Sequence, residues 1–445
     1  MPVIESTRAA TRWITRIVPV ILVAAVSYAT FVVVGRVCST FLINKRREVG
    51  AAIAILVLYF ILLLLMVATY LRTISTVLLD PGVAPVGARA EERRKNERDT
   101  RRQGRRGTDF ESRLYYEGPD LDPDSPGLEA FYTKDVFICE NDGRPKWCSE
   151  CCNWKADRAH HSSEINRCVY RMDHYCPWVG GMIGENSFKF FVQFVTYTAC
   201  YCGLVLGAAA SSLRKQLSEG SSLDAHFIAV IALAAFFGLF TFLMTVTSMR
   251  YIFFNMTNVD ALSSRSKVYQ LAVRVPRGTR STDKFLVVTY PLPKPGEQVN
   301  GRTSATSRVG NGTSEAGNGM SGASNGMLGA RIGSGMNPTT RDDLATRTFA
   351  VLKTEPGENP WDVGIWQNWQ TVMGTNIFDW FLPFRRSPCT NHESHDSFYP
   401  MGHVLADVLA RYGLSGVAGK DNSAGLEMKE LGRGSGNLED ARIGN

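Results

Sequence analysis

Four long apolar runs constrain the fold of this chain more than any other feature. None of the four contains Asp, Glu, Lys or Arg, and each exceeds the roughly 18 residues that indicate a bilayer span. The runs cover residues 17–35, 49–71, 190–213 and 227–249. We therefore expect a polytopic α-helical membrane protein with four transmembrane helices.

The first run has an alternative interpretation as a signal peptide, because Arg8, Arg12 and Arg16 precede it. The run is long for a signal peptide, and no clear small-x-small cleavage site follows it. We therefore treat it as a span. With four spans, both termini and the long segment between the second and third helices lie on the same side of the membrane.

Cysteine spacing indicates which side that is, since the charges around the first helix pair do not decide between the two orientations. Cysteines gather between residues 139 and 176 at spacings that are typical of metal sites. Such spacings favour a reducing compartment over a disulfide framework. We expect both termini and residues 81–187 in the cytosol, while the choice between endomembrane and plasma membrane stays open.

The segment after the second run begins with the turn "DPG" and continues with a basic run. Nine Lys or Arg residues oppose four Asp or Glu residues between Arg89 and Arg106, which leaves a net charge of +5. Such a run either binds anionic lipid headgroups or is a solvated, disordered insertion. Both interpretations stay open.

The region after the fourth run combines a low-complexity segment with an aromatic one. Residues 301–345 are rich in Gly, Ser, Asn and Thr. They carry too little apolar surface to offset the entropy of ordering, so we expect a disordered linker. Trp361, Trp366 and Trp369 follow in a polar setting. Their return indicates a segment that docks either on the membrane interface or on the cysteine-rich block.

The cysteine-rich block, residues 147–188, carries the strongest chemical signal. It contains a C-x2-C knuckle that can hold two corners of a tetrahedral zinc ion, and a histidine and a cysteine follow at spacings that can close the site. Cys152 and His160 stand next to proposed ligands and compete for the assignment. The expected ligands of one structural zinc ion are Cys148, Cys151, His161 and Cys168.

The same block contains "DHYC" at residues 173–176. This motif, the zinc ligands, the position between the second and third spans and the preceding "DPG" together resemble the DHHC cysteine-rich domain of protein S-acyltransferases. The DHYC form is the variant found in fungi, and the chain is similar to four-span fungal Pfa-type enzymes. The resemblance implies a protein S-palmitoyltransferase, which moves a long-chain acyl group from acyl-CoA to cysteine thiols of cytosolic or membrane-associated proteins.

Two alternatives belong to other functional classes. The first is a catalytically silent, zinc-bearing membrane scaffold, against which the complete Asp173, His174 and Cys176 set argues. The second is a channel or transporter, which finds little support because the apolar runs hold no Asp, Glu, Lys or Arg to mark an ion path. We expect the lipid bilayer and substrate proteins as partners, and no nucleic acid.

The resemblance also implies the roles of the motif residues. Cys176 is the nucleophile that carries the S-acyl intermediate, His174 is the general base, and Asp173 orients His174. A thiol becomes a strong nucleophile as a thiolate, which a neighbouring imidazole can generate. Two transfers through an acyl-enzyme predict ping-pong kinetics and an intermediate sensitive to hydroxylamine.

Members of this family usually bind two zinc ions, and the second site is where this sequence departs from them. The positions that hold three cysteines and a histidine in the family are occupied here by Ser162, Ile165, Tyr175 and Met182. Since all four ligands are replaced together, we expect that side-chain packing has taken over the role of the metal. We predict a small apolar cluster of Ile165, Tyr175 and Met182.

The third span carries aromatic residues at helical spacing, Phe190, Phe194, Tyr197 and Tyr201. This stripe either packs inside the bundle or lines a cavity. The family encloses the acyl chain between its spans, and it places a tryptophan near the reacting cysteine. The residues expected to line this acyl-chain cavity are Trp178, Phe191, Phe194 and Tyr201.

Two smaller groups of residues complete the expected site. The basic candidates for CoA phosphates are Lys155, Arg158 and Arg171, although each is equally well explained as a surface charge. The expected structural supports are Thr257 and Asp260 of the "TNVD" motif, where the family has Thr-Thr-x-Glu, and Asn368 of the C-terminal motif. The shortened acid at Asp260 leaves its contact with the cysteine-rich block open.

These features divide the chain into nine expected segments. They are an N-terminal segment 1–16, the first helix pair 17–79, a basic and acidic insertion 80–146, the catalytic cysteine-rich domain 147–188, the second helix pair 189–254, the TNVD segment 255–300, the linker 301–345, an aromatic C-terminal segment 346–400 and a flexible tail 401–445.

Overall fold

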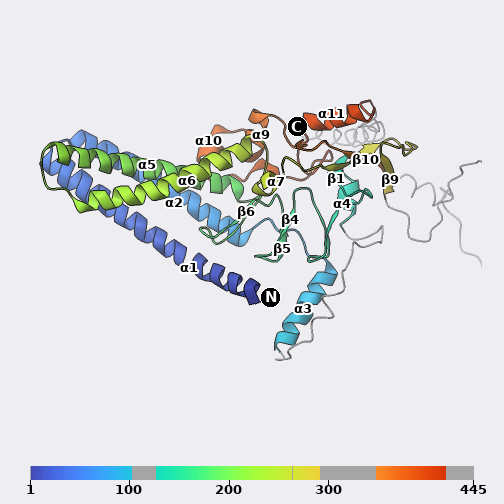
Figure 1. Cartoon of the computed structure of the whole chain (residues 1–445), viewed down its shortest axis with the longest axis horizontal. Helices are drawn as coiled ribbons and strands as arrows, with labels where there is room; N and C mark the ends of the chain where they lie inside the picture. The colour runs from blue at the N-terminus through green and yellow to red at the C-terminus, as the bar shows by residue number, and fades with distance from the viewer. Residues whose placement is uncertain (1, 103–126, 263, 291–346, 417–445) are drawn as a thin grey trace, which may run out of the picture.

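The computed structural model describes residues 2–102, 127–262, 264–290 and 347–416. Long helices run side by side and form one elongated end of the molecule, while the strands and short helices gather at the other end (Figure 1). The expected linker at 301–345 and the part of the expected tail beyond residue 416 lie outside the described residues.

The helical end contains the four expected spans. Helix α1 (Pro2–Thr30) continues as the π-helix η1 (Phe31–Lys45), and α2 (Val49–Leu79), α5 (Phe188–Ser218) and α6 (Ala225–Phe253) complete the bundle. The segments long and apolar enough to cross a membrane are Ile17–Lys45, Val49–Leu79, Phe188–Ser218 and Ala225–Phe253. The prediction of a four-span helical membrane protein is confirmed.

The bundle is apolar both inside and outside, as a lipid environment requires. Small or branched side chains such as Val33, Ala52 and Ala209 are buried between the helices. Large side chains such as Leu64 and Phe236 are exposed on the outer surface. A helix that is hydrophobic all round gains nothing from turning one face to water, so these helices are suited to a bilayer.

The cysteine-rich block folds into three short antiparallel hairpins between α2 and α5. The hairpins pair β2 (Lys146–Cys148) with β3 (Asn153–Lys155), β4 (His160–Ser162) with β5 (Arg167–Val169), and β6 (His174–Cys176) with β7 (Gly181–Ile183). Each hairpin is too small to be stable by itself in water. The block therefore depends on its packing, on the metal-type cluster described below and on the chain that surrounds it.

The basic run forms the helix α3 (Ala88–Arg102) as far as the structure describes it. Arg93 donates to the backbone carbonyl of Glu150 at 2.7 Å, and Arg94 donates to that of Asn166 at 2.7 Å. The first turns of α3 are therefore held against the cysteine-rich block. Arg105 and Arg106, which we counted in the same run, lie outside the described residues.

A four-stranded antiparallel sheet, which we did not predict from the sequence, lies beyond the cysteine-rich block. Its strand order is β1-β8-β10-β9. The strands are β1 (Val136–Ile138), β8 (Gln270–Val275), β9 (Leu286–Tyr290) and β10 (Arg347–Lys353). Short runs rich in Val, Leu, Phe and Thr, such as "LVVTY" and "TFAVL", were the available signal. Their partners are far away in sequence, so the pattern did not show which runs pair.

The sheet buries both faces because successive side chains point to opposite sides. Leu271 and Val273 pack on one face with residues of α11 (His403–Arg411), while Phe137 and Phe349 pack on the other with α4 (Glu129–Tyr132) and Trp154 of the cysteine-rich block. The remaining short elements are α7 (Asn258–Leu262), α9 (Ile365–Met373), α10 (Ile377–Phe381) and the 3-10 helix η2 (Pro388–Thr390).

Candidate active site and metal centre

Four expected metal ligands come together in the cysteine-rich block. The Nδ1 atom of His161 lies 3.5 Å from Cys148 Sγ, 3.4 Å from Cys151 Sγ and 4.0 Å from Cys168 Sγ. All four ligand atoms lie within 4.8 Å of one another. This is the one group of His, Cys, Asp or Glu side chains found in the described residues that is arranged to hold a metal ion.

The dimensions of this group fit zinc. A tetrahedral ion with Zn–S bonds of about 2.3 Å separates neighbouring ligand atoms by about 3.8 Å, and Zn–N bonds shorten that separation slightly. The observed 3.4 to 4.0 Å separations lie around this value. Three thiols and one imidazole are also the donor set of many structural zinc sites.

Hairpin geometry explains how these ligands meet. Cys148 ends β2, and the C-x2-C turn brings Cys151 back toward it before β3 begins. His161 and Cys168 are direct cross-strand partners in the second hairpin. Cys152, which competed for the assignment, instead donates from its Sγ to the carbonyl of Ser149 at 3.3 Å. The expected ligand set is therefore the one that the fold assembles.

The positions of the replaced second zinc site are partly brought together. Tyr175 and Met182 are direct cross-strand partners in the third hairpin, and Met182 is buried. Ser162 is buried, whereas Ile165 is half-buried in the turn of the second hairpin. The apolar cluster of Ile165, Tyr175 and Met182 stays a prediction.

The third hairpin also carries Cys176. The thiol is 3% exposed and belongs to an apolar cluster that includes Val77 of α2 and Phe191 of α5. Gly181, the cross-strand partner of Cys176, is needed for this packing, because a Cβ atom there would lie 2.2 Å from Cγ1 of Val77. The hairpin therefore presents Cys176 directly to the end of the helical bundle.

Asp173 and His174 form a hydrogen-bonded pair beside Cys176. The distance from His174 Nδ1 to Asp173 Oδ2 is 2.6 Å. The other ring nitrogen, Nε2, is buried and has no hydrogen-bond partner of standard geometry among the described residues. The ring of Phe191 covers the imidazole edge-on at 5.1 Å between centroids. The carboxylate thus fixes the tautomer that leaves Nε2 available to a thiol.

Opposing effects determine the pKa of His174. Burial lowers the pKa, but Asp173 and the interaction with Cys176 raise it by more than burial lowers it, and the net result is a pKa of about 9. A raised pKa means that the imidazolium form is favoured in the folded protein. An imidazolium beside Cys176 is the partner that stabilises a thiolate.

The backbone of the TNVD motif contacts Asp173, and we did not predict this contact from the sequence. The N–H of Asn258 donates to Asp173 Oδ1 at 2.8 Å. Thr257 and Asp260 form a capping box at the start of α7, with Thr257 Oγ1 3.0 Å from Asp260 Oδ2 and Asp260 N 3.1 Å from Thr257 Oγ1. This turn holds the N–H of Asn258 toward Asp173, so both carboxylate oxygens of Asp173 have a donor.

Asp260 also reaches the cysteine-rich block, which answers the question that its shorter side chain raised. Arg158 Nη2 lies 2.8 Å from Asp260 Oδ2, and Lys267 Nζ lies 3.4 Å from Asp260 Oδ1. Burial raises the pKa of Asp260, but the positive charges of Arg158 and Lys267 outweigh it and hold the pKa well below its ordinary value. The buried carboxylate is therefore charged and paired.

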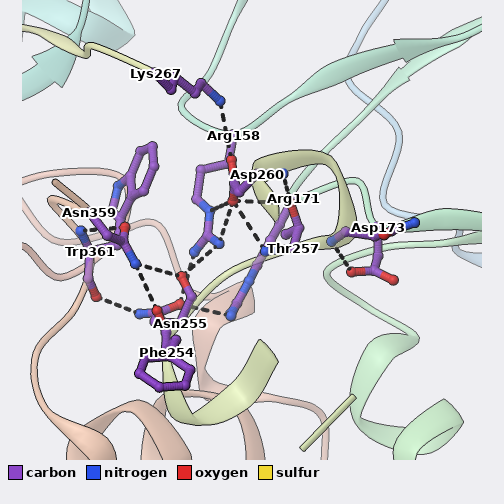
Figure 2. Close-up of polar contacts among 11 residues, drawn as sticks. Arg158, Arg171, Asp173, Phe254, Asn255, Thr257, Asp260, Lys267, Asn359 and Trp361 are labelled. Atoms are coloured by element: carbon purple, nitrogen blue, oxygen red, sulfur yellow. Dashed lines mark hydrogen bonds and ion pairs between the residues drawn. The ribbon is translucent and has the colours of Figure 1, made fainter. Parts of the chain in front are cut away.

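Figure 2 shows this network, in which Asn255 joins Arg158, Arg171 and Trp361. Asn255 Oδ1 accepts from Arg158 Nη1 at 2.9 Å and from Arg171 Nη2 at 2.8 Å, while its Nδ2 donates to the carbonyl of Trp361 at 2.7 Å. Asn255 has a φ of 46°, a left-handed conformation that asparagine tolerates better than most residues. An asparagine two residues beyond the end of α6 was the only sequence signal for this role.

This network corrects the expectation for two of the CoA-phosphate candidates. Arg158 and Arg171 are buried, and their guanidinium groups are committed to Asn255 and, for Arg158, to Asp260. The indole of Trp361 also covers Arg158 at 4.8 Å. Such groups are not open to a phosphate that arrives from solvent. Lys155, which is half-buried, stays a prediction.

The aromatic residues expected around the acyl chain lie between Cys176 and the middle of the bundle. Trp178 packs against Phe240 of α6 at 5.7 Å, and Phe194 packs against Tyr70 of α2 at 4.9 Å. Farther along α5, the hydroxyl of Tyr201 lies 2.7 Å from that of Tyr59. The ten residue steps from Phe191 to Tyr201 rise about 15 Å along the helix. A cavity along this line stays a prediction.

Asn368 joins the C-terminal segment to the end of the fourth span. It is fully buried on α9, and its Nδ2 donates to the carbonyl of Phe253 at 2.7 Å. Its Oδ1 accepts from the N–H of Val363 at 3.0 Å. These bonds satisfy a carbonyl at the C-terminal end of α6, where the helix has no further N–H to offer.

Comparisons with known proteins place this site in context. Residues 141–265 match the family model described as DHHC palmitoyltransferase. The chain is 36% identical to palmitoyltransferase pfa5 of Aspergillus fumigatus, over 90% of each protein. It is also 36% identical to palmitoyltransferase pfa5 of Emericella nidulans, over 93% of this chain and 88% of that protein. Palmitoyltransferase PFA5 of Saccharomyces cerevisiae is 24% identical over 57% of this chain and 65% of its own length.

Proposed function

The chain belongs to the DHHC palmitoyltransferase family, and on that premise we propose that it transfers acyl groups through a thioester on Cys176. The protein is a protein S-palmitoyltransferase. The observation that best supports the assignment of Cys176 is the 2.6 Å contact between His174 Nδ1 and Asp173 Oδ2. This contact directs the other imidazole nitrogen, Nε2, away from the carboxylate. His174 precedes Cys176 by two residues. The scaffold alternative is not favoured.

The first half-reaction consumes a long-chain acyl-CoA. His174 accepts the thiol proton of Cys176, and the thiolate attacks the carbonyl carbon of the acyl-CoA thioester. A new C–S bond to Cys176 forms, the C–S bond to CoA breaks, and the CoA thiolate takes the proton from His174. Asp173 keeps the imidazole oriented and stabilises its protonated form, which contributes to the raised His174 pKa of about 9.

The second half-reaction delivers the acyl group. A cysteine thiol of a substrate protein gives its proton to His174 and attacks the acyl carbon on Cys176. The new thioester forms on the substrate, and Cys176 leaves as a thiolate paired with the imidazolium. Neither half changes an oxidation state, so no redox partner is needed. The substrate cysteine gains a lipid chain that anchors its protein to the membrane.

Zinc has a structural role in this scheme. Cys148, Cys151, His161 and Cys168 would hold the ion, and Cys176 is not among them. When bound, the ion supplies folding free energy to hairpins that have little core of their own. It takes no part in the proton and acyl transfers.

We place the cysteine-rich block and both termini on the cytosolic side. Acyl-CoA and reduced substrate thiols are found there, and free thiols persist in a reducing compartment. None of the ten cysteines, which all lie within the described residues, forms a disulfide, and this supports the placement. The acyl chain would enter the bundle beside Trp178 and Phe191 and extend toward Tyr201, with Lys155 as the candidate contact for CoA phosphates.

Labelling with an alkyne analogue of palmitoyl-CoA tests the assignment of Cys176. Wild type should acquire a label that hydroxylamine removes, and Cys176→Ser should acquire none. Cys200→Ser is a matched control, because Cys200 is an exposed thiol on α5 and should be dispensable. Equal labelling of wild type and Cys176→Ser would rule out the proposed acyl-enzyme, while absence of label on wild type would favour the scaffold.

A further inference from the structure

An exposed apolar surface outside the four spans calls for an explanation. It consists of side chains on α9, on α10 and on the residues that follow α10, which we call the aromatic face: Ile365, Trp366, Ile377, Phe378, Phe381 and Phe384. Phe378 is 68% exposed and Phe384 is 72% exposed. Six large apolar side chains exposed within twenty residues are unusual for a surface that faces water.

The aromatic face lies next to the lipid-facing surface of the spans. Figure 1 shows α10 beside the bundle at the end nearest the strands. Asn368 bonds α9 to the end of α6, and Trp369 stacks on Phe253 of α6 at 5.9 Å. Exposed apolar side chains of the spans, such as Phe253 and Leu79, occur at this same end of the bundle. The aromatic face therefore extends the apolar surface of the spans.

Side chains of α5 donate hydrogen bonds to backbone carbonyls of this segment. Gln193 Nε2 donates to the carbonyls of Asp379 at 3.1 Å, Trp380 at 3.0 Å and Leu382 at 3.4 Å. Tyr197 donates its hydroxyl to the carbonyl of Phe381 at 2.7 Å. Four consecutive carbonyls at the end of α10 thus have side-chain donors. Such donors are required where water is absent, since an unsatisfied carbonyl in lipid costs several kcal/mol.

The position of these donors on α5 indicates their depth. Arg214 is the first charged residue toward the far end of α5 and marks the far side of the bilayer. Counting back the roughly 20 residues that cross a hydrocarbon core places the near boundary around residue 194. At about 1.5 Å per residue, Tyr197 then lies about 5 Å inside that boundary. The carbonyl of Phe381, which Tyr197 contacts, lies at a similar depth.

Charges continue the pattern at the end of the segment. Arg385 follows the aromatic face with its side chain 73% exposed, and Arg386 pairs with Asp80 at the end of α2. Basic residues that flank an apolar segment at a membrane surface can reach lipid phosphates. Trp366 and Trp380 contact each other at 5.6 Å, and tryptophan is enriched at membrane interfaces.

From these contacts we propose that residues 365–384 form an interfacial anchor, in which α10 dips into the near leaflet and the aromatic face contacts lipid acyl chains. The partner is the bilayer itself. One side of the segment is bonded to the end of α6 through Asn368, and the other side contacts lipid. The sequence alone allows either the membrane or the cysteine-rich block as the docking surface of this segment. The anchor assigns its exposed face to the membrane.

Quenching of tryptophan fluorescence by brominated lipid tests the anchor on the full-length protein. The protein is reconstituted in nanodiscs of phosphatidylcholine, with bromine near the headgroup end of the acyl chains in one sample and none in the other. Trp366 is 58% exposed on the aromatic face and should be quenched. Trp366→Phe should therefore lower the quenched share of the emission. Trp147→Phe, in the cysteine-rich block, should leave the quenched emission unchanged and remove only unquenched emission.

A second pair of variants separates insertion from simple loss of one fluorophore. Phe378→Asp places a charge on the aromatic face and should reduce quenching of Trp366. Leu286→Asp is the matched control, because Leu286 is 43% exposed on β9, away from the spans, and should leave quenching unchanged. If Trp366→Phe leaves the quenched share unaltered, the anchor is wrong and the aromatic face is better explained as a protein-docking surface. Equal effects of Phe378→Asp and Leu286→Asp would also overturn it.

Discussion

Replacing Asp173 by Asn tests the proposed origin of the thiolate. The change preserves the shape of the side chain but removes the charge that lies 2.6 Å from His174. Burial by itself lowers the pKa of His174, and the raised pKa of about 9 depends on Asp173 and Cys176. Without the carboxylate, the pKa of His174 should fall toward its ordinary value of 6.5.

The size of this effect follows from the shift in the pKa of His174. The difference between 6.5 and about 9 corresponds to roughly 3 kcal/mol of preference for the imidazolium, at about 1.4 kcal/mol for each tenfold change. Asp173 shares this preference with Cys176. We therefore expect Asp173→Asn to slow acylation by about 10- to 100-fold at neutral pH, since each factor of ten requires about 1.4 kcal/mol.

The pH dependence follows from the direction of the shift. The folded protein holds the pKa of His174 above its unfolded value, so protonated His174 stabilises the folded state. This stabilisation is fully present below about pH 6.5 and is lost as pH rises through about 9. The acylation rate of wild type should decline above about pH 9. In Asp173→Asn, the decline should move from about pH 9 toward pH 6.5. Single-turnover acylation with a fluorescent palmitoyl-CoA, followed across this pH range, measures both declines.

Asp157→Asn is the matched control. Asp157 is a buried aspartate of the same cysteine-rich block whose Oδ1 accepts from the N–H of Ile138 at 2.9 Å, and burial raises its pKa to about 7. Among the described residues, no hydrogen bond or ion pair joins Asp157 to His174, so its replacement should leave the pH profile unchanged. A profile of Asp173→Asn that still declines only above about pH 9 would refute the role assigned to Asp173.

Three further predictions concern stability, metal and chain length. Asp260→Asn leaves Arg158 buried without its charged partner, so the free energy of unfolding should fall by about 3–5 kcal/mol. Glu358→Gln, in the surface pair with Arg411, should cost less than about 1 kcal/mol, and equal thermal melts for both variants would contradict this. Mass spectrometry should find one zinc ion per wild-type chain and none in Cys168→Ser, in which acyl labelling should also disappear. Tyr201→Ala should shift a competition between acyl-CoAs toward longer chains, and an unchanged preference would exclude Tyr201 as the end of the cavity.

Local patterns in the sequence were sufficient for the spans and for the metal centre. An apolar run of about 20 residues has few stable alternatives to a membrane helix, because lipid leaves no other partner for backbone hydrogen bonds. Cys148 and Cys151 belong to one turn, and His161 and Cys168 belong to one hairpin, so their meeting depends on short-range geometry. The motif residues Asp173, His174 and Cys176 are likewise adjacent in sequence.

Only the tertiary structure decided how distant segments support this site. Strand β1 pairs with β8 across more than one hundred residues, and no local pattern specifies such a partner. The sequence allowed Arg158 to be a surface charge, whereas in the structure it is bonded to Asn255 and Asp260. Asn258 contacts Asp173 through its backbone N–H, a group that every residue except proline carries. The identity of residue 258 therefore did not indicate the contact. Sequence determines which groups are present, whereas burial and long-range pairing determine which of them meet.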